Sequence, residues 1–408
     1  MKNCIIVLIS LVLPISGCQK KMNEKMGNSF KDDIDFLRQY TDALVLKEPS
    51  GDGQIIVIPQ YQGRIMTSTL QGEAGEGYGW INYDLISSGE LDDHFNAFGG
   101  EDRIWLGPEG GQFSLYHRPG GPFDLDNWYV PPQIDTRPFK VESKSDQAVS
   151  FSSEFSIRNY SNTEFKVRID REVKIYTPEE ILSSLELESL ENCAAVGFES
   201  ENRLRNMDTV AWDKEKGLVS LWILGMYNPG DNVVIMLPYF QGGVGSLGEV
   251  VNDTYFGQVP TNRLKSSRGV VYFKGDGKYR SKIGMSWMRA KDILGSYNPD
   301  EKVLTIIKYN KPEEEADYVR AMWEIMDDPY GGDVINSYND GKPEPDKAPL
   351  GPFYELETSS AVTELEPGEE MVHIHKTFHI KGSEDQLNHI TERLFNVKLQ
   401  NIKDAFNH

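Results

Sequence analysis

The chain has 408 residues, of which 39% are hydrophobic and 11% aromatic, and 63 acidic against 42 basic side chains give a formal net charge of −21. This length and hydrophobic content predict a globular protein with a large buried core and exclude a disordered chain. The acidic balance argues against nucleic acid as a partner, because phosphates require basic surface patches.

The N-terminus has the features of an export signal. Lys2 is the only charge in residues 1–17, a short apolar stretch covers residues 5–13, and Ile-Ser-Gly-Cys follows at 15–18. The apolar stretch is too short for a membrane span, which takes roughly 20 apolar residues. The four residues ending at Cys18 resemble a bacterial lipobox, which implies cleavage before Cys18 and lipid attachment to it. An ordinary signal peptide with a chance cysteine is the alternative.

These features predict the organisation of the chain. Residues 1–17 are a lipoprotein signal peptide, residues 18–28 are the lipidated cysteine and a flexible polar tether, and residues 29–408 form a single domain. Gln19 is not the aspartate that is linked to retention in the inner membrane, so the resemblance implies the outer membrane of a Gram-negative bacterium. Cys193 is the only cysteine that remains besides Cys18, so no internal disulfide is expected.

The folded part begins with a helix signal and continues mostly as strands. Ser29 can cap a helix over residues 29–40, since Asp32 and Asp33 fall in its first turn. Strand-like runs separated by Gly, Pro and Asn clusters then cover residues 43–46, 54–58, 63–70, 148–158, 164–176, 194–202, 217–224, 232–237, 270–274, 279–288 and 302–309. This pattern predicts a large antiparallel β-sandwich or barrel.

Two further helices are expected towards the C-terminus. Residues 312–326 carry three glutamates near their start, followed by aromatic residues and methionines. Residues 383–402 have a stronger signal, because Ser383 and Gln386 form a capping-box pattern ahead of an aliphatic stripe. We expect this last helix to pack on the β-sandwich.

A candidate sugar-binding element lies at residues 99–111, where strand-like residues flank a Gly-Pro-Glu-Gly-Gly bend. Arg103 and Trp105 would point to the same side of a strand, because side chains alternate. An arginine fork donates to hydroxyls or a carboxylate, and an indole covers the apolar face of a sugar ring. The alternative is a core tryptophan beside a solvated arginine.

Both ends of the folded chain resemble one family. Residues 351–361 read Gly-Pro-Phe-Tyr-Glu-Leu-Glu-Thr-Ser-Ser-Ala, residues 365–369 read Leu-Glu-Pro-Gly-Glu, and a strand follows. Together with residues 63–65 and 100–109, these motifs resemble galactose mutarotase-like (aldose 1-epimerase-like) domains, and those of secreted lipoproteins more than the true epimerases. The resemblance implies an antiparallel β-supersandwich, with a few short peripheral helices and a C-terminal helix, whose concave sheet binds carbohydrate.

The resemblance also implies catalytic residues. In the family a glutamate near the C-terminus takes the proton of the anomeric hydroxyl, and a histidine protonates the ring oxygen. Glu357 matches the position of the base best, and Glu355 lies two residues earlier on the same strand face. No histidine lies between Arg118 and His373, which departs from the family pattern. His117 is a substitute candidate for the acid, and a histidine of the core is the alternative.

The same resemblance gives a set of substrate-binding candidates. Arg64 and Arg103 would hold hydroxyl groups, and Trp105 would stack on the sugar ring. The segment in which the family's histidine is expected offers Glu199, Asn202 and Arg203 instead. The predicted binding residues are therefore Arg64, Arg103, Trp105, Glu109, Asn202 and Glu355.

Metal binding is a secondary hypothesis, and no cofactor is firmly predicted. His373 and His375 lie on one face of a strand and could bind a transition metal, or they could belong to a polar sheet face. Residues 327–341 are rich in turns and oxygen ligands, so calcium at Asp333 and Asp340 is a candidate. Asn and Asp in tight turns have a backbone explanation as the alternative.

The sequence therefore predicts a lipid-anchored envelope protein with a mutarotase-like domain that binds carbohydrate, with acid–base conversion of a sugar as an extension. A non-catalytic envelope binding or structural protein is the alternative, which the missing mid-chain histidine favours. A polysaccharide lyase or hydrolase module is a further alternative. Hydrolysis by the usual mechanism would require two carboxylates about 5 to 9.5 Å apart.

Overall fold

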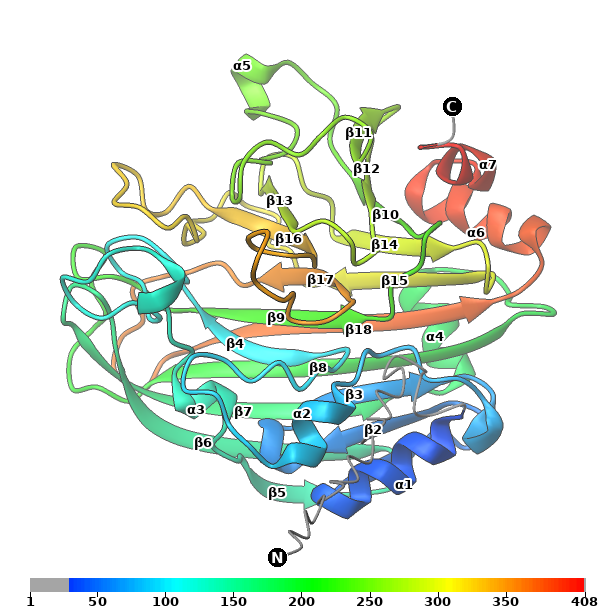
Figure 1. Ribbon diagram of the computed structural model, residues 1–408, viewed down its shortest axis with the longest axis horizontal. Helices are drawn as coiled ribbons and strands as arrows, with labels where there is room; N and C mark the ends of the chain where they lie inside the picture. Colours follow the sequence, from blue (N-terminus) through cyan, green and yellow to red (C-terminus); the bar gives the residue numbers. More distant parts are fainter. Residues whose placement is uncertain (1–28, 407–408) are drawn as a thin grey trace, which may run out of the picture.

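Strands dominate the structure, and within residues 29–406 they form three antiparallel sheets (Figure 1). The computed structural model describes residues 29–406, so the predicted signal peptide, Cys18 and the tether lie outside the described residues. The smallest sheet contains β1 (Leu44–Lys47), β2 (Gln54–Ile58) and β3 (Arg64–Thr69). In spatial order, the five-stranded sheet contains β13 (Ser281–Ser286), β16 (Asp333–Asn339), β17 (Tyr354–Ser359), β9 (Ser220–Tyr227) and β4 (Arg103–Gly107).

The largest sheet has ten strands and runs along the whole molecule (Figure 1). In spatial order it contains β11 (Leu264–Ser267), β12 (Val270–Lys274), β10 (Val234–Pro238), β14 (Ile293–Asn298), β15 (Val303–Tyr309), β18 (Glu370–Lys381), β8 (Ala194–Asn206), β7 (Glu164–Ile175), β6 (Ala148–Arg158) and β5 (Lys140–Lys144). Strands β6 and β7 pair along their whole length from Ala148–Lys174 to Arg158–Glu164.

Alternation along the strands explains how the sheets pack. In β7, Val167, Ile169, Arg171 and Val173 are buried, and exposed or half-buried polar residues alternate with them. Side chains alternate between the faces of a strand, so β7 has one buried face, which is apolar except for Arg171, and one polar face. Strand β9 is buried along its whole length, which indicates that both faces of the five-stranded sheet are covered at this strand.

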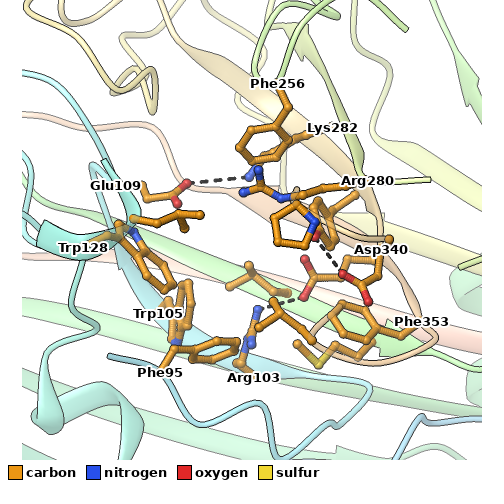
Figure 2. Close-up of a pocket in the computed structure, with 18 of the residues that line it drawn as sticks. Phe95, Arg103, Trp105, Glu109, Trp128, Phe256, Arg280, Lys282, Asp340 and Phe353 are labelled. Carbon is orange, nitrogen blue, oxygen red and sulfur yellow. Dashed lines mark hydrogen bonds and ion pairs between the residues drawn. The ribbon is translucent and has the colours of Figure 1, made fainter. Parts of the chain in front are cut away.

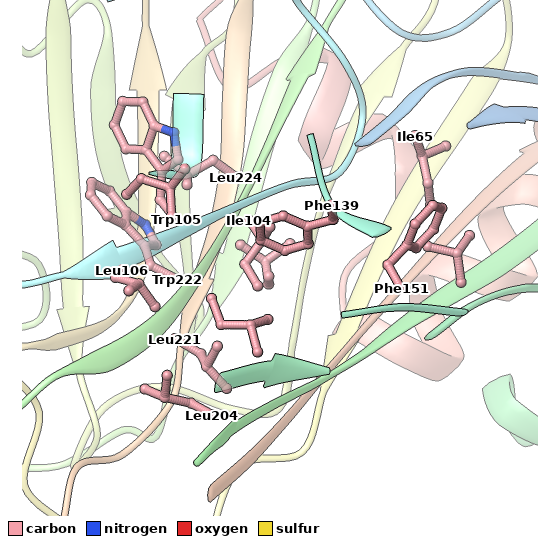
Figure 3. Packing of buried hydrophobic residues seen from close by; sticks show 14 of the residues in the cluster. Ile65, Ile104, Trp105, Leu106, Phe139, Phe151, Leu204, Leu221, Trp222 and Leu224 are labelled. Carbon is pink, nitrogen blue, oxygen red and sulfur yellow. The ribbon is translucent and has the colours of Figure 1, made fainter. Parts of the chain in front are cut away.

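The main core lies between the five-stranded and the ten-stranded sheets (Figure 3). Ile104 of β4 and Leu221 of β9 belong to the same buried cluster as Phe151 of β6 and Leu204 of β8. Because Ile104 points into this core, the flanking residues Arg103 and Trp105 point to the opposite face of the five-stranded sheet. That opposite face carries the candidate site.

Helices lie at the periphery. Helix α1 (Phe30–Tyr40) begins after Ser29, whose side chain accepts from the backbone N–H of Asp32. Helix α6 (Glu384–Phe395) begins with the capping box of Ser383 and Gln386. Helix α1 confirms the sequence prediction. The start at Ser383 is also confirmed, but the single helix predicted over residues 383–402 is divided at Asn396, whose left-handed backbone ends α6, and a second helix follows. The remaining helical segments are α2 (Tyr83–Ser88), α3 (Pro132–Asp135), α4 (Pro178–Leu185), α5 (Val244–Leu247), α7 (Leu399–Lys403) and the 3₁₀ turns Pro59–Tyr61, Gly72–Ala74 and Leu125–Asn127.

The C-terminal helices pack as expected. Leu387 and Ile390 of α6 share a buried cluster with Phe378 of β18 and Val234 of β10, so α6 covers the outer face of the ten-stranded sheet. Among the helices of residues 29–406, none has the length and apolarity needed to cross a membrane.

The predicted helix over residues 312–326 is wrong. This segment has no helical hydrogen bonding, because its backbone groups pair with distant partners. The N–H of Tyr318 donates to the carbonyl of Tyr330, and the N–H of Met326 donates to the side chain of Gln112. Residues 327–341 also differ from the expected run of turns, since β16 occupies most of their second half.

Candidate functional site

A cavity of about 210 Å³ opens on the face of the five-stranded sheet that points away from the main core (Figure 2). Trp105 of β4 pairs with Trp222 of β9, while Tyr338 of β16 pairs with both Glu355 of β17 and Lys282 of β13. Directly paired residues of antiparallel strands lie on the same face. The register of the sheet therefore places side chains from all five strands on one face, which forms the floor of the cavity.

Aromatic side chains form the walls of the cavity. The rings of Trp105 and Trp222 meet edge to face at 5.6 Å, and Trp128 stacks on Trp323 at 6.0 Å between ring centroids. Phe95 meets the Trp105 ring at 5.3 Å. Phe95, Trp128 and Trp323 come from segments outside the strands, so connecting segments complete a floor that the sheet begins.

Arg103 lies at the floor of the cavity with 2% of its side chain exposed. Its Nη2 donates to Glu355 Oε1 at 2.8 Å, and its Cζ lies 4.2 Å from the centroid of the Trp105 ring. Its Nε and Nη1 are buried and have no hydrogen-bond partner within residues 29–406. Arg103 and Trp105 thus share one strand face as predicted, and the arginine is not solvated.

A second buried charge group lies next to Arg103. Lys282 Nζ is 3.2 Å from Glu357 Oε2 and 3.9 Å from Glu109 Oε2. Trp222 Nε1 also donates to Glu357 Oε2, at 3.0 Å. Glu357 is fully buried behind Lys282 and Trp222, which line the cavity, and its Oε1 has no hydrogen-bond partner among the described residues.

Burial shifts the pKa values of these groups. It raises the pKa of Glu355 to about 8, with a further increase from Glu357 and an opposing effect of Arg103. It also raises the pKa of Glu109, against the opposing charge of Lys282. Burial lowers the pKa of Lys282, but the carboxylates led by Glu357 outweigh this effect, so that the pKa lies above its ordinary value. The cavity therefore holds a lysine that stays charged and carboxyls that bind protons more tightly than usual.

Besides Glu357, three predicted catalytic or binding residues do not line the cavity. Arg64 is buried elsewhere, where its Nη1 donates to the carbonyl of Gly99 at 2.9 Å and burial lowers its pKa to about 9. Asn202 lies between the sheets and accepts from Arg171 Nη1 at 2.6 Å. His117 lies behind Trp323, with its Nδ1 3.0 Å from Ser114 Oγ, and its backbone forms an isolated antiparallel bridge with Trp128.

The metal candidates have other partners. Asp333 accepts from the Tyr255 hydroxyl at 2.7 Å, and Asp340, beyond the other end of β16, accepts from the N–H of Gly351 at 2.9 Å. His373 and His375 both hydrogen-bond with Thr358 Oγ1, at 2.8 and 2.9 Å. Within residues 29–406, no group of three or more His, Cys, Asp or Glu side chains is arranged to hold a metal ion.

The structure thus brings together Arg103, Trp105, Glu109 and Glu355, with Glu357 directly behind them. Sequence reasoning missed the other charged and aromatic contributors, which include Trp128, Trp222, Arg280, Lys282 and Trp323. One signal was present in the sequence, since Lys282 interrupts the predicted strand over residues 279–288 with a charge that the structure buries.

Comparisons with known proteins identify the family of the chain and solved structures with a similar fold. A family model described as a family of unknown function (DUF6786) matches residues 28–406, and no curated protein matches the chain. A crystal structure from Escherichia coli K12, named as a candidate aldose 1-epimerase, is 11% identical with a TM-score of 0.50 and covers 84% of this chain and 100% of its own.

Two other solved structures are similar over the same region. A protein of Synechocystis sp. PCC 6803 is 10% identical with a TM-score of 0.48, and covers 84% of this chain and 98% of its own. A galactose mutarotase-like protein from Lactobacillus casei is 12% identical with a TM-score of 0.45, and covers 83% of this chain and 99% of its own. The likeness to the Escherichia coli structure confirms the predicted galactose mutarotase-like fold.

Proposed function

The chain belongs to a family of unknown function, DUF6786, and from its fold and its cavity we propose that it binds a carbohydrate on the face of the five-stranded sheet that carries Arg103 and Trp105. One observation carries the proposal. Arg103 is buried at the cavity floor, stacked on Trp105, with two donors that no group of residues 29–406 accepts.

A saccharide would satisfy both features of this floor. A buried donor without a partner costs roughly 1–3 kcal/mol, so a ligand that supplies an acceptor gains this free energy on binding. Sugar hydroxyls are such acceptors, and the apolar C–H faces of sugar rings suit the Trp105, Trp128 and Trp222 rings around them. The likeness to an Escherichia coli protein named for aldose 1-epimerase supports this ligand class.

The test is a titration of the purified full-length protein with a panel of mono- and oligosaccharides, in which calorimetry and tryptophan fluorescence measure binding. We expect Arg103→Gln to weaken binding by about tenfold or more, since hydrogen bonds to a charged donor are worth about 1.5–3 kcal/mol. Arg168→Gln is the matched control, because Arg168 pairs with Asp170 on β7, far from the cavity lining. No heat and no fluorescence change with any saccharide, from a folded protein, would reject the proposal.

Conversion of the bound sugar is the extension of this proposal. Glu357 Oε1, directly behind the cavity lining, is an acceptor without a partner in the described part of the chain, so Glu357 is the candidate base, as the sequence predicts. Glu355 is the candidate acid in place of the missing histidine, because burial raises its pKa to about 8 and a proton remains on it at neutral pH. The same samples, observed by exchange NMR with free aldoses, test this extension. If the wild-type protein accelerates the exchange between anomers, Glu357→Gln should abolish that acceleration. A wild-type protein that does not accelerate the exchange would leave binding as the function.

We further propose that a lipid on Cys18 anchors the domain in the outer membrane. The polar residues between Cys18 and α1 would then act as the tether. Metabolic labelling with palmitate should mark the wild-type protein and not Cys18→Ser. Equal labelling of both would contradict the anchor.

A further inference from the structure

On the basis of the proposed carbohydrate binding, we propose that the ligand is an anionic saccharide, and that Arg280 binds its carboxylate or sulfate group. Arg280 directly precedes β13 and lines the same cavity as Arg103 and Lys282. Figure 2 shows the Arg280 side chain on the opposite side of the cavity from Arg103.

Arg280 is held in place without an ionic partner. Its Cζ lies 3.7 Å from the centroid of the Phe256 ring, which fixes the guanidinium by a cation–π contact. Within residues 29–406 its side chain forms no ion pair and no hydrogen bond, whereas Arg103 pairs with Glu355 and Lys282 with Glu357. The guanidinium of Arg280 therefore keeps its donors for a ligand, and such a planar fork matches a carboxylate.

The charge of Arg280 acts on two carboxyls of the cavity lining, Glu109 and Asp340, and Asp340 is already engaged by hydrogen bonds. One of its oxygens accepts from the Tyr338 hydroxyl at 2.8 Å and the other from the N–H of Gly351 at 2.9 Å. Asp340 therefore lowers the local potential without taking the donors of Arg280. An anion of the ligand can take them.

The unpartnered atoms of the cavity lining point to the same ligand chemistry. The buried polar atoms of lining residues that lack a partner are Arg103 Nε, Arg103 Nη1, Trp105 Nε1 and Trp128 Nε1. All four are hydrogen-bond donors. A carboxylate or a sulfate contributes acceptors only, so it complements a lining whose open positions are donors.

The carboxyls around the cavity repel an anionic ligand less strongly than the same number of ionised carboxylates would. Burial raises the pKa of Glu109 and of Glu355, and it raises the pKa of Asp340 to about 6. The pKa of about 8 keeps a proton on Glu355 at neutral pH, while Lys282, whose pKa lies above its ordinary value, stays charged. The preference for an anion would arise locally, since the whole chain is acidic and repels anions at long range.

The experiment compares each acidic ligand with its own neutral form. Oligosaccharides of galacturonate, glucuronate and mannuronate are titrated into the full-length protein beside their methyl esters, which keep the skeleton and lose the charge. A sulfated galacto-oligosaccharide and its desulfated form give the second anion source. We expect one acidic ligand to bind at least about tenfold more tightly than its neutral form, as a charge-assisted fork predicts.

Arg280→Gln should remove this preference. It should weaken the acidic ligand by about tenfold and leave the neutral form within about twofold, because only the anion contacts Arg280. Arg320→Gln is the matched control, since Arg320 lines a neighbouring surface pocket and pairs with Asp328 at 3.6 Å. Phe256→Ala removes the platform of Arg280 and should reduce the preference in part.

The outcomes separate this inference from the proposed function. Binding of neutral and acidic forms with equal affinity, or equal weakening of both by Arg280→Gln, would overturn the anionic ligand and leave carbohydrate binding standing. Sulfated but not uronate binding would support the anion and identify its source. No binding of any saccharide, neutral ones included, would reject carbohydrate binding and the anionic ligand together.

Discussion

The chemistry of Glu355 depends strongly on its surroundings. It is buried beside another carboxylate, Glu357, and among residues 29–406 its one ion-pair partner is Arg103. Burial raises its pKa from 4.5 to about 8 against the opposing charge of Arg103. The folded state therefore binds a proton at Glu355 over a pH range in which the unfolded chain has released it.

This shift predicts how stability depends on pH. The free energy of unfolding includes a contribution from Glu355 that is fully present below pH 4.5 and is lost as the pH rises through about 8. Urea unfolding between these pH values should show a decline in stability for the wild type, and Glu355→Gln should flatten it, because an amide does not titrate. Glu366→Gln, at an exposed position, is the control. An unchanged slope in Glu355→Gln would contradict the shift.

Local patterns predicted only those site residues whose neighbours in sequence are also neighbours in the site. Alternation placed Arg103 with Trp105 and Glu355 with Glu357, and the structure confirms that the members of each pair share a strand face. Lys282 and Arg280 were not predicted as site residues, because their position beside Glu109 and Glu355 depends on the pairing of β13 with β16. No local spacing encodes that contact.

At the scale of elements, capping signals were reliable and composition was less so. Ser29 and Ser383 mark helix starts through hydrogen bonds made within three residues, so the sequence contains the whole cause. Residues 312–326 have a helical composition without a cap, and their backbone pairs with residues 112, 330 and 362. Tertiary pairing overrides weak helical preference in such a segment.

At β16 the sequence predicted turns where the structure has a strand. Its sequence, Asp-Val-Ile-Asn-Ser-Tyr-Asn, has the residues of turns, yet it lies inside the five-stranded sheet. Ser337 Oγ donates to the carbonyl of Glu355 at 2.6 Å, and Asn339 Nδ2 donates to the carbonyl of Tyr279 at 2.9 Å. Polar side chains are tolerated in a buried strand once such bonds satisfy them.

At the scale of the whole molecule, a buried ion pair joins the sheets beneath the cavity. Arg171 of β7 contacts Asp102, next to β4, with Nη2 and Oδ1 2.6 Å apart, and both side chains are fully buried. Arg171 also donates to Asn202 on β8, while Ser200 donates to Asp102 at 2.7 Å. This network accounts for the position of Asn202, which the sequence assigned to substrate. It holds β4, and with it Arg103 and Trp105, against the ten-stranded sheet.

Removing one partner of this pair should destabilise the whole fold. Arg171→Met leaves the carboxylate of Asp102 buried without a counter-charge, which typically costs about 3–5 kcal/mol. Arg168→Met is the matched control on the same strand. Arg168 pairs with Asp170 at 2.7 Å, but both side chains are about a third exposed, and such pairs contribute about 0–1 kcal/mol. Urea denaturation of both variants measures the difference, and the double variant Asp102→Asn with Arg171→Met should recover part of the loss. Equal costs for Arg171→Met and Arg168→Met would show that the buried pair does not tie the sheets together.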